Sequence, residues 1–160
     1  NMNNLISSLL IALTCTAIGC AHGLIEGTTV PDTEENRAVL DVLKTYRSAM
    51  QERDPAKIID LVSSEYFEDM GTIDQSDDYG YQHLTEKIIP NSLQVAQEVY
   101  LTFEIHNIHV DGDSAWADVR YNARAKLGLS SGDIWESHKD FNRIELLMND
   151  KGRWMIKAGL

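Results

Sequence analysis

The sequence predicts an α+β domain in which helices precede a mainly antiparallel sheet. Three observations support this prediction. Apolar residues recur at helical spacing over residues 39–50. From Val99 onward they alternate with polar residues instead, as in a half-buried strand. The segment Val-Asp-Gly-Asp at residues 110–113 is a hairpin signal between two alternating runs, so consecutive strands are expected to pair antiparallel.

The first two helices have recognisable start signals. The first helix is expected to begin near Asp32, because Glu35 follows three residues later in the pattern of a capping box. Its apolar stripe includes Tyr46. A second, shorter helix is expected at Asp54-Pro55, with Asp54 as N-cap and Pro55 in the first turn, where no N–H donor is needed.

The remaining elements follow a polar loop. A short strand is expected over residues 66–70, and a third helix would be capped by Asp77 or Asp78 and ended or kinked by Pro90. The strands of the sheet then form a meander, and the helices should cover one face of it. These strands are expected over residues 99–105, 115–121 and 135–148, and from Trp154 onward.

Composition fits a single acidic domain. The chain has 160 residues, of which 43% are hydrophobic, as in one globular domain. Its formal net charge of −11 disfavours a nucleic-acid partner, because phosphate binding needs a basic surface. Neither cysteine lies beyond residue 20. The domain therefore has no disulfide, cysteine nucleophile or thiolate metal site.

The first residues are predicted to be a signal peptide. An apolar run covers residues 5–18. This run is short for a membrane-spanning helix, which needs ~20 apolar residues, and it is typical of the central region of a signal peptide. We expect a signal peptide over residues 1–19, a lipidated cysteine with a tether over residues 20–31, and a folded domain over residues 32–160.

The residues before Cys20 resemble the lipobox of bacterial lipoproteins, in which small residues precede a cysteine that is lipidated and becomes the mature N-terminus. Ala17 and the glycine before Cys20 fit this pattern, whereas Cys15 follows Thr14, a poorer cleavage context. The resemblance implies an exported protein that is membrane-anchored through Cys20, in the outer membrane or periplasm if the cell has two membranes. Simple secretion after a cut at Ala21 and a different leader or anchor are the alternatives.

Several segments of the domain resemble the nuclear transport factor 2-like superfamily, which includes SnoaL-like polyketide cyclases and ketosteroid isomerase. They lie at residues 46–69, 79–84, 110–121 and 151–160, and the resemblance covers about residues 33–160. It implies a cone-shaped, cystatin-like fold, in which a strongly curved sheet wraps about three N-terminal helices and leaves an apolar pocket at its open end. It also implies a possible homodimer through the outer sheet face, which carries Tyr100, Thr102 and Glu104.

The resemblance to ketosteroid isomerase implies three site residues. Tyr46 matches the place of the tyrosine that donates to an oxyanion, and Asp69 matches the place of the general base. Asp140 is the nearest candidate for the further acid. Two other interpretations stay open, because Tyr46 can be a packed core residue and Asp69 the polar end of a strand. Asp69 shares a strand face with Phe67, and if that face is inward, Glu68 points away.

Aromatic and apolar residues near these positions are expected to line the pocket. No cofactor and no metal site are expected. His106 and His109 lie three apart on a predicted strand, so they face opposite sides and cannot bind one ion together. His138 and Asp140 share a face, but a metal site there would need ligands from elsewhere. The expected lining residues are Tyr66, Phe67, Met70, Trp116 and Trp135.

These observations support two main hypotheses about function. In the first, an envelope lipoprotein binds a small hydrophobic ligand in its pocket, or a partner protein, without chemistry. In the second, the domain is an isomerase, dehydratase or cyclase in which Asp69 moves a proton beside a carbonyl and Tyr46 stabilises the enolate. The second hypothesis requires the Tyr46 hydroxyl and the Asp69 carboxylate to point into one cavity. A purely structural dimer is a third possibility.

Overall fold

A computed structural model describes residues 23–160 of the chain. The expected signal peptide, Cys20 and the first part of the expected tether lie outside these residues. The helices are α1 (Glu34–Glu52), α2 (Pro55–Ile59), α3 (Tyr81–His83), the π-helical turn η1 (Leu84–Ile88) and α4 (Ile89–Val95). The strands are β1 (Phe67–Glu68), β2 (Tyr79–Gly80), β3 (Ala96–Asp111), β4 (Ser114–Leu129), β5 (Gly132–Met148) and β6 (Trp154–Ala158).

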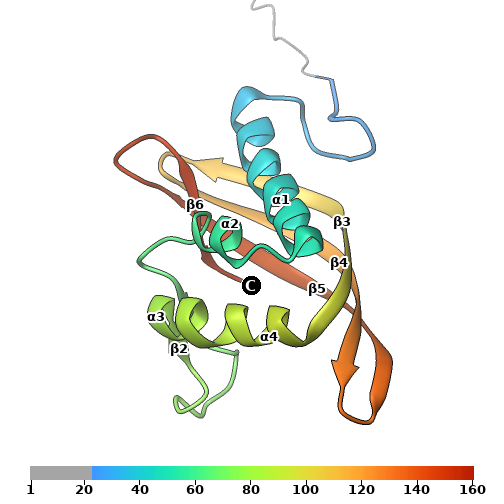
Figure 1. Ribbon diagram of the computed structural model, residues 1–160. Coiled ribbons are helices and arrows are strands. Elements are labelled where there is room, and N and C mark those ends of the chain that lie inside the picture. Colours follow the sequence, from blue (N-terminus) through green and yellow to red (C-terminus); the bar gives the residue numbers. More distant parts are fainter. Residues whose placement is uncertain (1–22) are drawn as a thin grey trace, which may run out of the picture.

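The predicted α+β architecture is confirmed. Strands β3, β4, β5 and β6 form an antiparallel sheet in sequence order, and β1 and β2 form a separate short pair. Figure 1 shows α1 crossing the sheet, the α3–α4 segment running below it, and the end of the chain, labelled C, between α2 and α4. None of the described helices is long and apolar enough to cross a membrane.

Helix α1 begins one residue later than the capping-box pattern predicts. The N-cap is Thr33, whose side-chain oxygen accepts a 3.1 Å hydrogen bond from the Asn36 backbone N–H. Asp32 instead pairs with Arg37, with 2.7 Å between Nη2 and Oδ2. Threonine and aspartate are both favourable N-caps, so local sequence could not choose between them.

Helix α2 begins as predicted. The Asp54 side chain accepts a 3.1 Å hydrogen bond from the Lys57 backbone N–H, and Pro55 is the first helical residue. This short helix turns the chain back toward the sheet. The backbone N–H of Ser63, just beyond it, donates to the carbonyl oxygen of Ile156 in β6 at 2.8 Å.

The third helical segment differs from the prediction at its start, and at Pro90 it is interrupted rather than ended. It begins at Tyr81 with Gly80 as N-cap, whereas Asp77 accepts a 2.9 Å hydrogen bond from the Thr72 hydroxyl inside the preceding loop. Pro90 does not end the segment, because it lies in the first turn of α4, directly after the π-helical turn η1. Proline has no N–H to donate to the preceding turn, and the wider π turn lies where the regular hydrogen-bond pattern is interrupted.

The sheet bends at irregularities in β3. Its register with β4 shifts between Ala96 and Glu98 and again between Ile105 and Asn107, and such bulges increase local twist and bending. Between β4 and β5 the register is continuous along the whole pairing, including at Asn142. The shift in β5 lies further on, at Glu145, where it pairs with β6.

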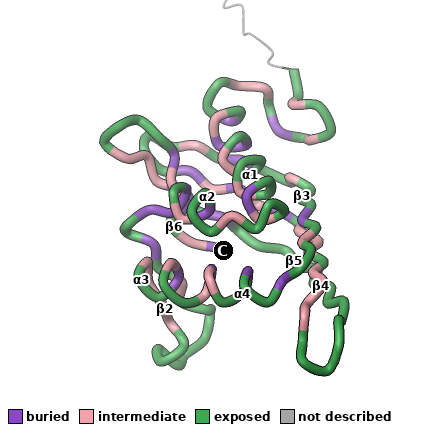
Figure 2. The backbone as a smooth tube through the Cα atoms, in the orientation of Figure 1, coloured by how far each residue is buried: buried purple, intermediate pink, exposed green. Residues whose placement is uncertain are grey.

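The core lies between α1, α2, η1, α4 and the inner face of the sheet, and it also includes a residue expected in the tether. Val30 is only 1% exposed, and an antiparallel bridge between Leu24 and Pro31 closes the turn that carries it. The folded domain therefore begins before Asp32. Figure 2 shows the buried residues inside the fold and the tip of the β4–β5 hairpin exposed beyond it.

Candidate functional site

Two adjacent cavities lie between the helices and the sheet, and Tyr46, Met50 and Leu160 border both. The cavity on the sheet side has a volume of about 170 Å³. The cavity on the α4 side has a volume of about 120 Å³. The first is lined further by Leu101, Phe103, Val119, Tyr121, Ala123, Asn142, Ile144 and Gly159. The second is lined further by Ile58, Leu84, Ile88, Ile89, Ser92 and Leu93.

Tyr46 extends from α1 toward both cavities. Its ring stacks on Phe103, with 6.2 Å between ring centroids. Within residues 23–160 no group is hydrogen bonded to its hydroxyl. Burial raises the pKa of Tyr46 to about 12, with smaller contributions from Tyr121 and Tyr79. The hydroxyl is therefore neutral at physiological pH and is available as a hydrogen-bond donor.

Two predicted site residues, Tyr46 and Asp140, lie near the same end of the sheet, linked by Tyr121. Tyr121 borders the sheet-side cavity with Tyr46 and pairs across the strands with Asp140. Burial, and secondarily the negative charge of Asp140, raise the pKa of Tyr121. Asp140 itself does not border the cavity, because its carboxylate is 64% exposed and lies 4.0 Å from Nε2 of His138.

Asp69 does not share a cavity with Tyr46. It is exposed, and its Oδ1 accepts a 3.0 Å hydrogen bond from the backbone N–H of Gly71 in a local turn. Met70 and Gly71 both have positive φ, so the chain turns away from the fold directly after Asp69. The inward placement considered for Asp69 and Phe67 is wrong, since Phe67 is 53% exposed.

The acid that faces inward is Glu68. Its Oε2 accepts hydrogen bonds from the Gly159 backbone N–H at 2.8 Å and from the Tyr66 hydroxyl at 3.1 Å. Tyr66 is 2% exposed and stacks on Tyr79, with ring centroids 6.2 Å apart. Burial strongly raises the pKa of Tyr66. Side chains two positions apart on a strand point to the same face. Because the large Tyr66 side chain is buried, Glu68 also points inward.

Most of the other expected lining residues lie elsewhere. Met70 is 52% exposed, and Tyr66 is buried beside the cavities without bordering either of them. Trp116 and Trp135 lie on the outer face of the sheet, so the expectation that they line the pocket is wrong. The guanidinium of Arg143 lies 3.9 Å from the Trp116 ring centroid, and another arginine stacks likewise on Trp135.

Four polar residues lie at the site but were not predicted from the sequence to belong to it: Glu68, Tyr79, Tyr121 and Asn142. The signal for Tyr121 was available, because it continues the inward alternation of Ala117 and Val119. Asn142 could not be found from periodicity, since neighbouring residues of β5 are exposed on both faces. Its Nδ2 donates to the carbonyl oxygen of Gly159 at 3.0 Å.

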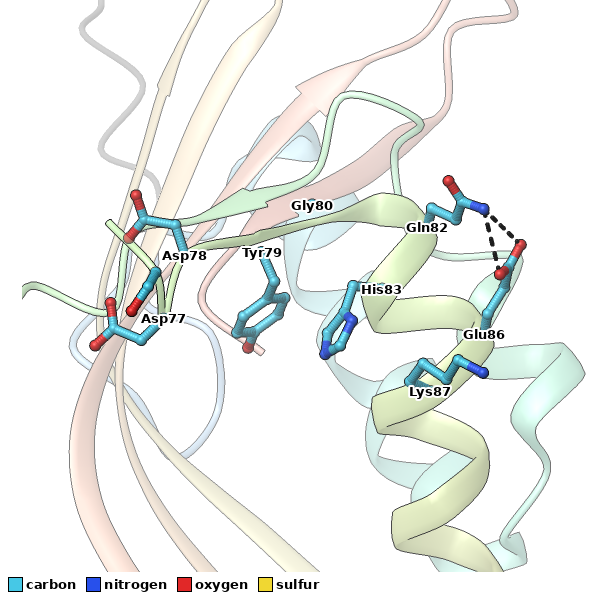
Figure 3. Close-up of a pocket in the computed structure, with 9 residues that line it drawn as sticks. Asp77, Asp78, Tyr79, Gly80, Gln82, His83, Glu86 and Lys87 are labelled. Atoms are coloured by element: carbon cyan, nitrogen blue, oxygen red, sulfur yellow. Dashed lines mark hydrogen bonds between the residues drawn. The ribbon is translucent and has the colours of Figure 1, made fainter. Parts of the chain in front are cut away.

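A larger cleft of about 760 Å³ lies between the loop before β2 and the α3–η1 segment. Figure 3 shows Tyr79 and His83 facing each other across it, and their ring centroids are 6.0 Å apart. On the α3–η1 side of the cleft, the side-chain amide of Gln82 donates to the Glu86 carboxylate at 3.3 Å. The cleft is wide and polar, and Tyr79 connects it to the inner site through a 3.3 Å hydrogen bond to the Leu160 carbonyl oxygen.

Residues 23–160 contain no group of three or more His, Cys, Asp and Glu side chains arranged to hold a metal ion. No protein-family model matches the chain, and no curated protein does. Solved structures do match it. A candidate scytalone dehydratase from Novosphingobium aromaticivorans superposes with a TM-score of 0.64 at 13% identity, over 78% of this chain and 80% of that one.

Two further structures show the same similarity. A nuclear transport factor 2-like superfamily protein from Salmonella enterica has a TM-score of 0.61 at 14% identity, over 77% of this chain and 86% of that one. A candidate ketosteroid isomerase from Shewanella frigidimarina has a TM-score of 0.57 at 15% identity, over 76% of this chain and 92% of that one. The chain therefore has the α+β fold of the nuclear transport factor 2-like superfamily.

Proposed function

We propose that the domain binds a small, mostly apolar molecule that carries a carbonyl or hydroxyl oxygen, in the cavity bordered by Tyr46. The observation that carries this proposal is the Tyr46 hydroxyl, which has no partner among the described residues and borders an otherwise largely apolar space. A ligand oxygen in reach of this donor would gain a hydrogen bond in a low-dielectric site. Tyr121 and Asn142 border the same cavity and supply further polar contacts.

The size of the cavity limits the ligand. Its volume of about 170 Å³ is close to that of a cavity of about 150 Å³ that binds benzene in another protein. Leu101, Val119 and Ile144 form apolar walls that favour a desolvated ring or short chain. A ligand with about eight to ten non-hydrogen atoms fits these limits.

The alternative of an isomerase, dehydratase or cyclase has less support. Among similar structures, one carries the name of a ketosteroid isomerase and one that of a scytalone dehydratase. A general base must be able to reach the proton that it abstracts. Asp69 is exposed and hydrogen bonded within its own turn. Glu68 borders neither cavity, and its Oε2 accepts from the Tyr66 hydroxyl and the Gly159 N–H. A binding domain accounts for these contacts without a base.

We also propose that the protein is exported and anchored in the cell envelope by a lipid on Cys20. The apolar run over residues 5–18 and the small residues before Cys20 support this proposal. A single acyl chain binds membranes only marginally, so stable anchoring would need the two or three chains typical of lipoproteins. The outer sheet face is proposed to pair two copies of the chain, as the exposed Tyr100, Trp135 and Phe141 suggest.

Acetophenone and ethylbenzene test the ligand proposal, because they differ mainly in one carbonyl oxygen. Titration calorimetry or NMR should show that the full chain binds acetophenone about fivefold more tightly, which corresponds to one net hydrogen bond of about 1 kcal/mol. Tyr46→Phe should remove this preference while keeping affinity for ethylbenzene. Ala123→Leu should weaken both ligands by filling the cavity.

Tyr100→Phe is the matched control. Tyr100 is an exposed tyrosine on the outer face whose hydroxyl donates to Glu98 at 3.1 Å. Its replacement should leave both affinities unchanged. If neither compound binds, or if Tyr46→Phe retains the preference for the ketone, the proposed ligand class is wrong.

A further inference from the structure

The segment Gly159–Leu160 lies at both cavities, because Leu160 borders each of them together with Tyr46 and Met50. It follows β6 and leaves the sheet after Ala158, whose partner in β5 is Glu145. Leu160 borders the cavity of about 170 Å³ on one side and the cavity of about 120 Å³ on the other. Figure 1 shows this end of the chain between α2 and α4, in the middle of the fold. Withdrawal of the segment would enlarge both cavities, since each would lose Leu160 as a wall.

Every polar main-chain group of this segment is hydrogen bonded to a side chain rather than to a neighbouring strand. Each N–H has a side-chain acceptor, and each carbonyl oxygen has a side-chain donor. The Gly159 N–H donates to Glu68 Oε2 at 2.8 Å, the Gly159 oxygen accepts from Asn142 Nδ2 at 3.0 Å, the Leu160 N–H donates to the Tyr66 hydroxyl oxygen at 3.1 Å, and the Leu160 oxygen accepts from the Tyr79 hydroxyl at 3.3 Å. Such a set recognises the main-chain N–H and carbonyl groups of two consecutive residues.

The side chains of Glu68, Asn142, Tyr66 and Tyr79 form a frame around the segment. The first residue held in this frame must be a glycine. Gly159 is buried and has φ +92°, a conformation that disfavours other residues. A Cβ at this position would clash with the backbone oxygen of Arg143. The following position is different, because the leucine side chain reaches apolar walls from Ile144 on one side and Leu93 on the other. The frame thus fits a glycine followed by a leucine-sized residue.

We propose that this frame is a binding site for peptide-like ligands and that Gly159–Leu160 is its internal occupant. The proposal rests on the proposed function, because it takes the cavity beside Tyr46 as part of the ligand site. If the segment moved out, Glu68, Asn142 and Tyr79 would lose partners in a half-buried site, which is unfavourable. A hydrocarbon would leave these groups unpaired, whereas an amide followed by a branched aliphatic group satisfies them. The ligand therefore belongs to the class of short apolar peptides and related amides.

The first experiment displaces the internal occupant. N-acetyl-glycyl-leucinamide reproduces the amide groups of the segment and serves as the probe. Gly159→Ala in the full chain should force the segment out of the frame, so the probe should bind at least tenfold more tightly than to the unaltered chain. Gly152→Ala is the control, because Gly152 also has positive φ but a Cβ there meets nothing within 4 Å. This control should leave the affinity unchanged.

A second variant covers the case in which Gly159→Ala does not fold. Leu160→Ala removes a side chain that borders both cavities. It should weaken the packing of the segment and again raise affinity for the probe at least tenfold. N-acetyl-alanyl-leucinamide should bind this variant at least tenfold more weakly than the glycyl probe, because its extra methyl group meets the Arg143 backbone oxygen. Both affinities can be measured by titration calorimetry on protein whose fold is verified by circular dichroism.

The outcomes separate this proposal from the proposed function. If folded Leu160→Ala binds the glycyl probe no more tightly than the unaltered chain, or binds both probes equally, the peptide frame is refuted. This would leave the ligand proposal intact where acetophenone still binds in a Tyr46-dependent way. Conversely, glycine-selective binding of the peptide by the variants would support the frame even if acetophenone showed no dependence on Tyr46.

Discussion

The Glu68 carboxylate accepts a 2.8 Å hydrogen bond from the backbone N–H of Gly159, although the two residues lie 91 positions apart in the chain. This bond connects the short strand β1 to the segment that follows β6. The same carboxylate oxygen accepts from the Tyr66 hydroxyl. Glu68 therefore holds the end of the sheet against β1, while its neighbour Asp69 is hydrogen bonded only within a local turn.

This relationship predicts unequal effects for the two acids. Glu68→Ala should lower the free energy of unfolding by about 2 kcal/mol, because a hydrogen bond to a charged group contributes about 1.5–3 kcal/mol. Asp69→Ala is the matched control and should cost less than about 1 kcal/mol, since it loses one exposed bond. Urea denaturation measures both values. A larger loss for Asp69→Ala than for Glu68→Ala would contradict the assignment of Glu68 as the inward acid.

Alkaline pH should destabilise the protein through Tyr46. Burial raises its pKa from 10.0 to about 12, so the unfolded chain loses this proton before the folded chain does. Stability from this group is fully present below pH 10 and falls as the pH rises toward 12. At about 1.4 kcal/mol per unit, the loss reaches roughly 3 kcal/mol. Tyr46→Phe should flatten this part of the stability profile.

Urea denaturation at a series of pH values, with absorbance to follow tyrosinate formation, checks this prediction. The chain has six tyrosines, so the Tyr46→Phe difference spectrum is needed to assign the late transition. Tyr100→Phe is a suitable comparison, because Tyr100 is 53% exposed. An unchanged profile in Tyr46→Phe would show that other groups cause the alkaline loss.

The proposed dimer predicts that a charge on the outer sheet face shifts the chain toward monomer. Phe141 is 58% exposed, and the guanidinium of Arg120 lies 4.6 Å from its ring centroid. Phe141→Asp would place an unpaired carboxylate in a buried interface, which is costly. Sedimentation analysis should then show at least a tenfold weaker association. Ile73→Asp, in an exposed loop, is the control and should have no effect. A monomeric unaltered chain would refute the dimer.

The proposed lipid anchor predicts different outcomes for the two cysteines. Cys20→Ser should abolish incorporation of labelled palmitate and leave the protein unanchored, because serine cannot form the thioether that carries the lipid. Cys15→Ser should retain both labelling and membrane association, since Cys15 lies inside the expected signal peptide. Fractionation of a bacterial cell that expresses each variant provides the readout. Labelling that depends on Cys15 rather than Cys20 would overturn the proposed cleavage site.

Local chemistry made much of the fold predictable. The cap at Asp54, the hairpin at residues 110–113 and the alternation along β3 and β4 involve neighbours in sequence, and the structure contains all three. The candidate site was less predictable. Tyr46 was identified by its place in the resemblance to ketosteroid isomerase, and the apolar stripe of its helix indicated that it faces inward. The orientation of Asp69 was assigned from similarity of position, and the structure places Glu68 inward instead.

The sequence by itself determined the α+β class, the order of the elements and the position of Tyr46, because each depends on periodicity and caps that act over a few residues. Tertiary structure alone decided which face of β1 is buried and what occupies the space beside Tyr46. A strand of two residues is too short for alternation to define its phase. Burial of Tyr66, and the bonds that Gly159 and Leu160 make with residues more than 90 positions earlier, fix that phase.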